Sequence, residues 1–229
     1  MLREKLYPYV GSIFNSWADA LNRKGIAPHQ LTLAGGGLSL LAGFLFSSSS
    51  LFSGTLVMLL AGTCDALDGP LARLSGKASD FGAFFDSTID RFADGFILAG
   101  IALHFFNQDE PFWITLVLGL LIASFAVSYT KARAENFIDK CSVGLFTRET
   151  RYVAIAVGTL LPIFLKPILM ITFFGTLWTA YQRIVYTQEQ LEKIYFGTKD
   201  QEPRTKKKNL ASALGSWFLV PGSHRVPCC

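Results

Sequence analysis

The chain has little charge and few cysteines, and both shortages narrow its class. Charged residues fill only 17% of its 229 positions, whereas soluble domains contain about 25%. A hydrophobic fraction of 51% argues against a disordered chain or a collagen-like repeat. The formal net charge of +4 is small, and we expect no nucleic-acid partner. The cysteines show no CxxC spacing and imply no disulfide framework; they are Cys64, Cys141, Cys228 and Cys229.

Two long stretches of the sequence lack charge altogether. No Asp, Glu, Lys or Arg occurs in the 40 positions from Gly25 to Cys64 or in the 20 positions from Pro111 to Thr130. A helix needs about 20 mostly apolar residues to cross a bilayer, so these stretches predict membrane spans rather than buried helices of a soluble protein. No cleavable secretory signal is expected, because the first 24 residues carry charges throughout and lack a compact apolar core.

An all-α integral membrane fold with six transmembrane helices is predicted from the apolar runs. The spans are expected at about residues 31–46, 51–74, 81–105, 111–135, 152–165 and 167–186. Residues 1–24 carry apolar and charged side chains at helical spacing, which predicts an amphipathic juxtamembrane helix; an ordinary solvated helix is the alternative. Residues 1–187 would form the membrane domain, and residues 188–229 a polar, partly basic cytoplasmic tail.

Basic residues are distributed unevenly among the connecting loops. The first, third and fifth loops contain only Lys166, whereas the second and fourth contain Arg73, Lys77, Lys131, Arg133, Lys140, Arg148 and Arg151. The positive-inside rule therefore predicts a multi-pass protein of the cell membrane with both termini and the even-numbered loops in the cytoplasm. The basic cluster of Arg204 and residues 206–208 predicts a solvated tail, with a lipid headgroup contact as the alternative. Cys228 and Cys229 are weak candidates for lipidation.

Aspartates interrupt the second and third expected spans near their cytoplasmic ends. Asp65 and Asp68 lie three residues apart, whereas Asp86, Asp90 and Asp94 lie four apart, so each set projects from one helix face. A short loop makes the two helices antiparallel neighbours, and the two acidic faces should then meet. Charged residues inside a membrane are costly and are functional candidates by default.

The facing carboxylates predict a metal site. They repel one another unless a cation lies among them, and oxygen ligands favour Mg²⁺, Mn²⁺ or Ca²⁺. The bland alternative is that the acids only pair with Arg73, Lys77 and Arg91 at the membrane surface. Gly69 and Gly82 flank the acidic faces and would admit a close ligand. Carboxylate-held metals often serve phosphoryl transfer, so the pattern predicts a metal-dependent membrane enzyme that acts on a phosphate-containing lipid.

The segment from Asp65 to Asp90 reads DALDGPLARLSGKASDFGAFFDSTID. It matches every fixed position of the pattern D-x2-D-G-x2-A-R-x8-G-x3-D-x3-D and so resembles the CDP-alcohol phosphotransferase family. This resemblance covers about residues 1–187. It implies that an acceptor hydroxyl attacks the β-phosphorus of a CDP-linked lipid and that CMP leaves. It also implies a homodimer.

The resemblance assigns roles to residues of the first three expected spans. Asp65, Asp68 and Asp86 would hold two divalent cations, Mg²⁺ or Mn²⁺, and Asp90 would be the catalytic base and a further metal ligand. Contacts with the CDP-lipid are expected from His29, Gln30, Leu31, Thr32, Gly69, Ala72, Arg73, Ser79 and Gly82. An Asn or Asp is usual in the family where this chain has His29, and a surface-facing histidine is the alternative there.

Basic residues near the cytoplasmic ends of the later spans predict that the acceptor itself carries a phosphate. The candidates are Lys131, Arg148, Arg151 and Arg183, whose converging donors would suit such a group. Positive-inside charges that only touch lipid headgroups are the alternative.

Two short segments sharpen the choice of acceptor. SYTKARAE (residues 128–135) and VGLFTRETR (residues 143–151) resemble the subgroup that makes phosphatidylinositol phosphate, or its archaeal counterpart, from inositol phosphate. Thr147 and Thr150 replace two glutamates usual in the second segment, and glycerol 3-phosphate is the main alternative acceptor. A cation transporter is a remote alternative, because the acids of a transporter would lie near the bilayer midplane within an inverted repeat. The acids here lie near the cytoplasmic ends of their spans. A protein that binds CDP-lipid without catalysing the transfer is a further alternative.

Overall fold

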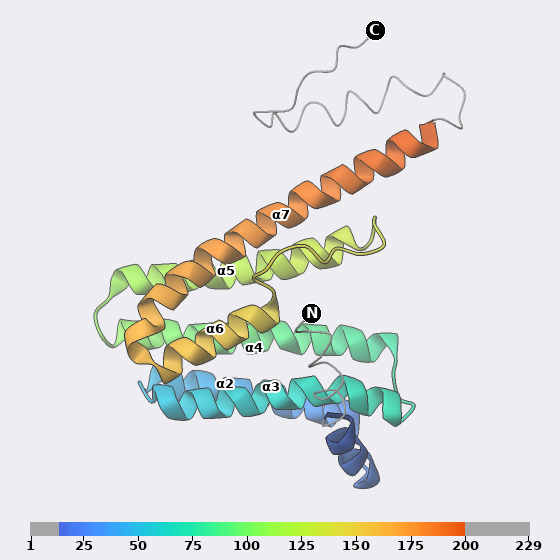
Figure 1. Ribbon diagram of the computed structural model, residues 1–229. Coiled ribbons are helices and arrows are strands. Elements are labelled where there is room, and N and C mark those ends of the chain that lie inside the picture. Colours follow the sequence, from blue (N-terminus) through green and yellow to red (C-terminus); the bar gives the residue numbers. More distant parts are fainter. Residues whose placement is uncertain (1–13, 200–229) are drawn as a thin grey trace. The chain divides into compact units, whose positions relative to one another are not determined.

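The computed structural model describes residues 14–199 of the chain (Figure 1). It divides after Thr187 into two units, Met1–Thr187 and Gln188–Cys229. The described residues are helical and contain no β-strand, as the sequence predicts. After a helical segment at residues 14–23, the helices are α2 (Pro28–Ser47), α3 (Leu51–Leu74), α4 (Asp80–Phe106), α5 (Pro111–Ala134), α6 (Arg148–Leu160), the short 3-10 helix η1 (Pro162–Phe164) and α7 (Leu165–Lys199).

Some predictions concern residues that the structure does not describe. Residues 1–13 of the predicted amphipathic helix are among them, whereas residues 14–23 are helical. The basic cluster at Arg204 and residues 206–208, and the terminal Cys228 and Cys229, also lie outside the described residues.

Prolines and a serine cap set where several helices begin. Pro28 and Pro111 occupy the first turns of α2 and α5, where a missing backbone N–H costs nothing. Ser79 caps α4, since its Oγ accepts a hydrogen bond from the backbone N–H of Gly82 at 3.1 Å. Gly76 adopts a φ of 65° in the turn between α3 and α4, a conformation that glycine tolerates best. This short turn places the two acidic helices next to each other.

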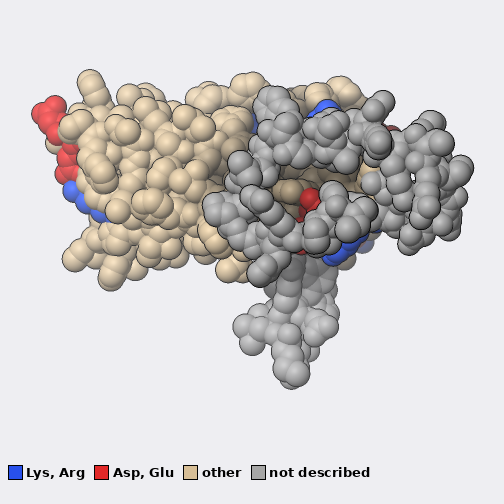
Figure 2. Space-filling view, turned by 90° about the horizontal axis from the view of Figure 1, so that it is seen from above, with Lys and Arg blue, Asp and Glu red and all other residues tan. Residues whose placement is uncertain are grey.

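Among the described residues, four segments are long and apolar enough to cross a membrane: Pro28–Ser47, Leu51–Leu74, Pro111–Ala134 and Pro162–Tyr195. The third and fifth expected spans also form helices, α4 and α6, but α4 carries several charges and α6 has only 13 residues. Helix α6 begins at Arg148, earlier than the expected residue 152, and α7 continues past residue 186 to Lys199. Most of the described surface in Figure 2 is neither acidic nor basic, as a lipid-facing surface requires.

Helix α2 packs against both α3 and α4, and near Gly43 the backbones of α2 and α4 touch. A Cβ atom on Gly43 would collide with the carbonyl of Phe96, and one on Gly100 would collide with the backbone of Gly43. Small residues allow such close approach between membrane helices. Buried side chains continue the core on either side of this contact, among them Phe46, Met58, Ile101, Leu120 and Leu169.

We predict that Gly43→Ala lowers the stability of the protein by about 1–3 kcal/mol, because the added methyl group overpacks the contact between α2 and α4. Gly37→Ala is the matched control on the same helix, since no atom lies within 4 Å of the position that its Cβ would take. Thermal unfolding of both variants in detergent micelles measures the difference. Equal stability of the two variants would contradict the backbone contact.

Candidate active site

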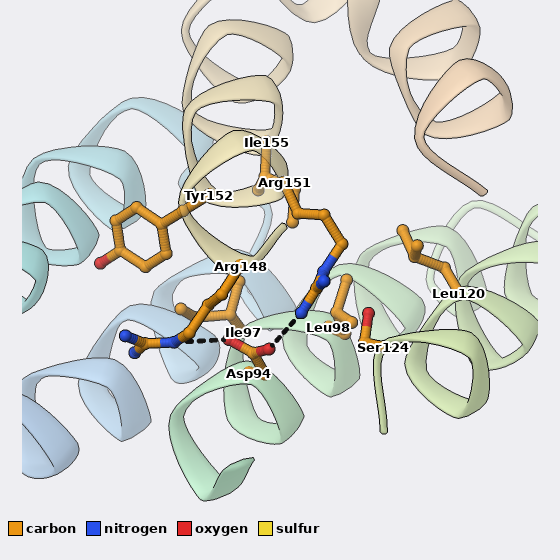
Figure 3. A pocket seen from close by; sticks show the side chains of 9 residues that line it. All are labelled: Asp94, Ile97, Leu98, Leu120, Ser124, Arg148, Arg151, Tyr152 and Ile155. Atoms are coloured by element: carbon orange, nitrogen blue, oxygen red, sulfur yellow. Dashed lines mark hydrogen bonds and ion pairs between the residues drawn. The ribbon is translucent and has the colours of Figure 1, made fainter. Parts of the chain in front are cut away.

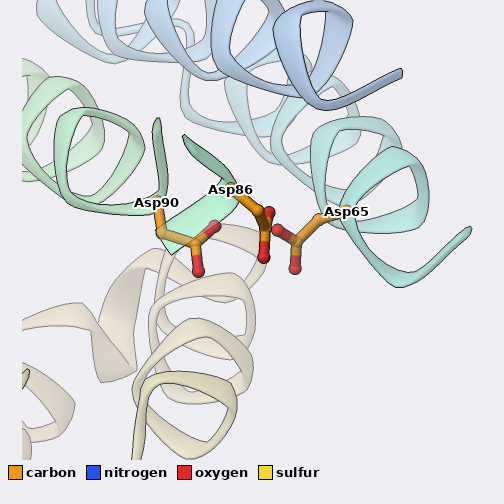
Figure 4. A group of neighbouring side chains, drawn as sticks. All are labelled: Asp65, Asp86 and Asp90. Atoms are coloured by element: carbon orange, nitrogen blue, oxygen red, sulfur yellow. The ribbon is translucent and has the colours of Figure 1, made fainter. Parts of the chain in front are cut away.

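Three carboxylates from two helices converge at one place. Asp65 of α3 and Asp86 and Asp90 of α4 each contribute an oxygen, and these oxygens lie within 4.8 Å of one another (Figure 4). The four-residue spacing on α4 and the antiparallel neighbour α3 produce this arrangement, as the sequence predicts. Oδ1 of Asp86 is buried and has no hydrogen-bond partner in the described structure. Oxygens that are this close, with one of them unpartnered, fit a hard divalent cation.

Asp68 lies outside this converging group. Its side chain is buried and accepts a hydrogen bond from the hydroxyl of Thr32 at 2.7 Å. The hydrogen bond joins α3 to the start of α2, the segment predicted to contact the nucleotide. The role of Asp68 as a metal ligand remains a prediction, because the described geometry groups only the other three acids.

Arg148, the first residue of α6, supplies a positive charge among the acids. Its Nη1 lies 2.8 Å from Asp65 and its Nη2 lies 2.9 Å from Asp90. Its Nε lies 3.4 Å from Asp94, so one guanidinium meets three carboxylates. The sequence predicts a contact of Arg148 with the acceptor phosphate, but no local pattern indicates its three carboxylate partners.

The surface pairing considered from the sequence is present only in part. Arg91 lies 3.6 Å from Asp90. Arg73 and Lys77 are exposed and form no ion pair with another described residue. The charges of the acids are therefore offset mainly by α6, which follows them in the chain by more than fifty residues.

Arg151 and Tyr152 complete the contact between α6 and the acidic helices. Arg151 is buried, and its Nη2 lies 2.9 Å from Asp94. The hydroxyl of Tyr152 donates a hydrogen bond to the carbonyl of Met58 in α3. A Cβ atom on Gly62 would lie 2.9 Å from the Tyr152 ring, so this glycine makes room for the ring. No sequence pattern indicated the pairing of Tyr152 with α3.

The other two predicted acceptor residues are placed differently. Arg183 of α7 is buried and donates hydrogen bonds to the carbonyls of Val143 and Val127, at 3.1 and 2.5 Å. Its donors therefore serve backbone oxygens in this structure. Lys131 is exposed in the last turn of α5. Contact of either side chain with an acceptor remains a prediction.

The residues predicted to bind CDP-lipid lie at the same end of α2, α3 and α4. His29 and Gln30 are exposed, Leu31 is half-buried, and Gln30 accepts a hydrogen bond from the backbone N–H of Ala27 at 2.9 Å. The space beside Gly69 is open up to Arg73, whose Nη1 would lie 3.6 Å from a Cβ placed there. Ala72 is half-buried, whereas Ser79 and Gly82 are exposed and form the cap of α4.

The chain belongs to the CDP-alcohol phosphatidyltransferase family, whose model matches residues 25–182. This range contains the three converging acids and the arginines of α6. The resemblance expected from the segment between Asp65 and Asp90 is thereby confirmed.

Relatives and solved structures show which members of the family the chain is similar to. It is 35% identical over 187 residues to archaetidylinositol phosphate synthase of Pyrococcus horikoshii, a match that covers 79% of this chain and 97% of the relative. The fold matches Mycobacterium tuberculosis phosphatidylinositol phosphate synthase PgsA1 with CDP-DAG bound, with a TM-score of 0.64, 28% identity, and coverage of 80% of this chain and 94% of that one. The same enzyme in complex with manganese and citrate gives a TM-score of 0.63 at 27% identity, with coverage of 86% and 98%.

We predict that Asp86→Asn weakens Mn²⁺ binding by about tenfold or more, because the change removes a charged oxygen that has no other partner. The electron paramagnetic resonance signal of free Mn²⁺ measures the affinity of the detergent-solubilised protein. Asp109→Asn is the control, since Asp109 lies in the turn before α5 with a φ of 55° that asparagine tolerates. An Asp86→Asn affinity equal to that of the control would contradict the metal site.

Proposed function

We propose that this protein transfers a phosphatidyl-type group from a CDP-linked lipid to a phosphorylated polyol, with inositol phosphate as the preferred acceptor, and releases CMP. The observation that carries the proposal is the convergence of Asp65, Asp86 and Asp90 beside Arg148 and Arg151. The names of the similar proteins, archaetidylinositol phosphate synthase and phosphatidylinositol phosphate synthase, support inositol phosphate.

Asp65, Asp86 and Asp90, together with Asp68, are the residues that would hold two divalent cations, Mg²⁺ or Mn²⁺. Such ions neutralise the charge that develops on phosphate oxygens during phosphoryl transfer. The chemistry of the donor set supports this assignment, because the three converging groups offer only carboxylate oxygens. The similar structure that contains manganese supports it too.

Asp90 is the proposed base. Its carboxylate would accept the proton of the attacking hydroxyl while the acceptor oxygen bonds to the β-phosphorus and the bond to the CMP oxygen breaks. Its side chain is only 15% exposed and lies 2.9 Å from Arg148. The guanidinium of Arg148 stabilises the negative charge of Asp90 before Asp90 takes up the proton.

Arg148 and Arg151 are the proposed binding groups for the acceptor phosphate. Guanidinium groups present several N–H donors in one plane, which suits the oxygens of a phosphate. Both arginines lie at the start of α6 beside the acids, so a phosphate bound there would keep the rest of the acceptor close to Asp90. Lys131 and Arg183 would extend this site, if the donors of Arg183 turn from their backbone carbonyls.

The proposal includes six membrane spans, both termini and the active site on the cytoplasmic side, and a homodimer. The positive-inside pattern of the loops supports the orientation. The acids lie near the joined ends of α3 and α4, which supports a lipid substrate. Such a molecule could keep its tails in the bilayer and its phosphates at the membrane surface.

We predict that the purified protein releases CMP from labelled CDP-diacylglycerol or its ether analogue when Mg²⁺ or Mn²⁺ and inositol phosphate are present together. Parallel reactions with glycerol 3-phosphate and with unphosphorylated inositol measure acceptor choice. If glycerol 3-phosphate but not inositol phosphate supports CMP release, glycerol 3-phosphate is the acceptor. If unphosphorylated inositol supports as much CMP release as inositol phosphate, the proposed role of the arginines is contradicted.

We predict that Asp90→Asn lowers the transfer rate by about 100-fold or more, because an amide cannot accept the proton of the hydroxyl. CDP-lipid binding and the folded state should persist, as measured by equilibrium binding and thermal unfolding. Asp80→Asn is the control, since Asp80 is exposed on the same helix and outside the converging group. Turnover of Asp90→Asn near that of Asp80→Asn would rule out the base.

A further inference from the structure

Asp94 lies on α4 one helical turn beyond Asp90, and its carboxylate bonds both arginines of α6 (Figure 3). Its Oδ1 lies 3.4 Å from Nε of Arg148, and its Oδ2 lies 2.9 Å from Nη2 of Arg151. The side chain of Asp94 is 14% exposed and that of Arg151 is 4% exposed. Each oxygen of this acid therefore faces a different cation in a largely buried place.

The cavity beside this pair of contacts is lined by Ser124 and Tyr152 and by several apolar side chains. Ile97, Leu98, Leu120 and Ile155 line the same small cavity as Asp94 (Figure 3). Ion pairs are stronger in such surroundings than in water, but a charge left there without a partner is costly. Without the Asp94 carboxylate, Arg151 would have the carbonyl of Phe146, 3.1 Å from its Nη1, as its remaining described acceptor.

Arg148 depends on two kinds of carboxylate. Asp65 and Asp90 belong to the group that fits a divalent cation, whereas Asp94 does not. Asp65 and Asp90 would share their oxygens between Arg148 and any divalent cation held there, which would weaken the two contacts with the Nη atoms. The contact between Nε and Asp94 is independent of the metal-binding acids, and so is the contact between Asp94 and Arg151.

We propose that Asp94 is a positioning residue that holds Arg148 and Arg151 in the site and aims their donors at the acceptor phosphate. This inference rests on the proposed function, because it assigns the anchor of the proposed phosphate-binding arginines. An arginine that is already oriented loses less freedom when it binds a phosphate, so its anchor contributes to acceptor affinity. Asp94 does not touch the reacting atoms in this assignment.

The test is the kinetics of Asp94→Asn. We expect the KM for the phosphorylated acceptor to rise about tenfold or more, while kcat changes less and the KM for CDP-lipid stays within about twofold. Inhibition by inorganic phosphate should weaken by a similar factor. Mn²⁺ affinity should change little, because Asp94 lies outside the converging group.

Glu110→Gln is the matched control, since it also removes a carboxylate that pairs with a cation from another helix. Glu110 lies 2.8 Å from Lys166 and precedes α5. This variant can lose stability but should keep the acceptor KM of the wild-type protein. An acceptor KM that rises no more in Asp94→Asn than in Glu110→Gln would overturn the proposal. Equal effects of Asp94→Asn on acceptor and CDP-lipid would overturn it as well.

A second variant covers the case in which Asp94→Asn does not fold. Asp94→Glu keeps the charge but lengthens the side chain by one methylene group, so both guanidinium groups must shift. The acceptor KM should then rise several-fold with an unchanged KM for CDP-lipid, and an unchanged acceptor KM would overturn the proposal.

The wild-type protein separates this inference from the proposed function. If a different phosphorylated acceptor supports CMP release, the choice of inositol phosphate fails, and the Asp94 variants are compared with that acceptor instead. If no acceptor is used, the stabilisation of the protein by inorganic phosphate in thermal unfolding decides. A smaller stabilisation in Asp94→Asn than in Glu110→Gln supports the anchor, and equal stabilisation overturns it.

Discussion

Repulsion among carboxylates is the constraint on which the arrangement of α3, α4 and α6 depends. Oxygens of Asp65, Asp86 and Asp90 lie within 4.8 Å of one another. At that range, two like charges repel by on the order of 3 kcal/mol in a protein interior of intermediate dielectric constant. Arg148 offsets this repulsion although it follows a long connection, so its ion pairs hold the start of α6 against α3 and α4. A divalent cation would serve the same electrostatic need and would change how strongly Arg148 is held.

The periodic part of the site could be predicted from the sequence, and the rest could not. Spacings of three and four residues fix which aspartates share a helix face, and the short turn at Gly76 fixes that α3 and α4 are neighbours. The partners of Asp68 and Asp94 come from other helices, and no local pattern specifies them. Helix α6 follows an irregular connection, residues 135–147, whose path determines which of its arginines reach the acids. The apolar runs predicted the helices well, but charge content and length leave the spanning role of α4 and α6 a prediction.

The position of Arg183 shows how one residue type can serve two purposes. Its charge and its place near the end of the sixth expected span predict a phosphate contact. In the structure its donors bond the carbonyls of Val143 and Val127 and so tie the connection before α6 to α5. A buried guanidinium needs acceptors whether or not a ligand is present. The residue therefore supports the segment that carries Arg148, whatever its contact with a substrate.

Gly62 carries no charge, but its contact with Tyr152 affects the position of the charged residues of α6. The ring of Tyr152 lies where a side chain at position 62 would lie, and Tyr152 follows Arg148 by one helical turn. The absence of a side chain at Gly62 therefore lets α6 approach α3 closely enough for Arg148 to reach the acids. A side chain at position 62 would collide with the Tyr152 ring, although glycine itself takes no part in the chemistry. A variant with a larger residue at position 62 would keep every ionisable group of the site, but Arg148 would be displaced from the acids.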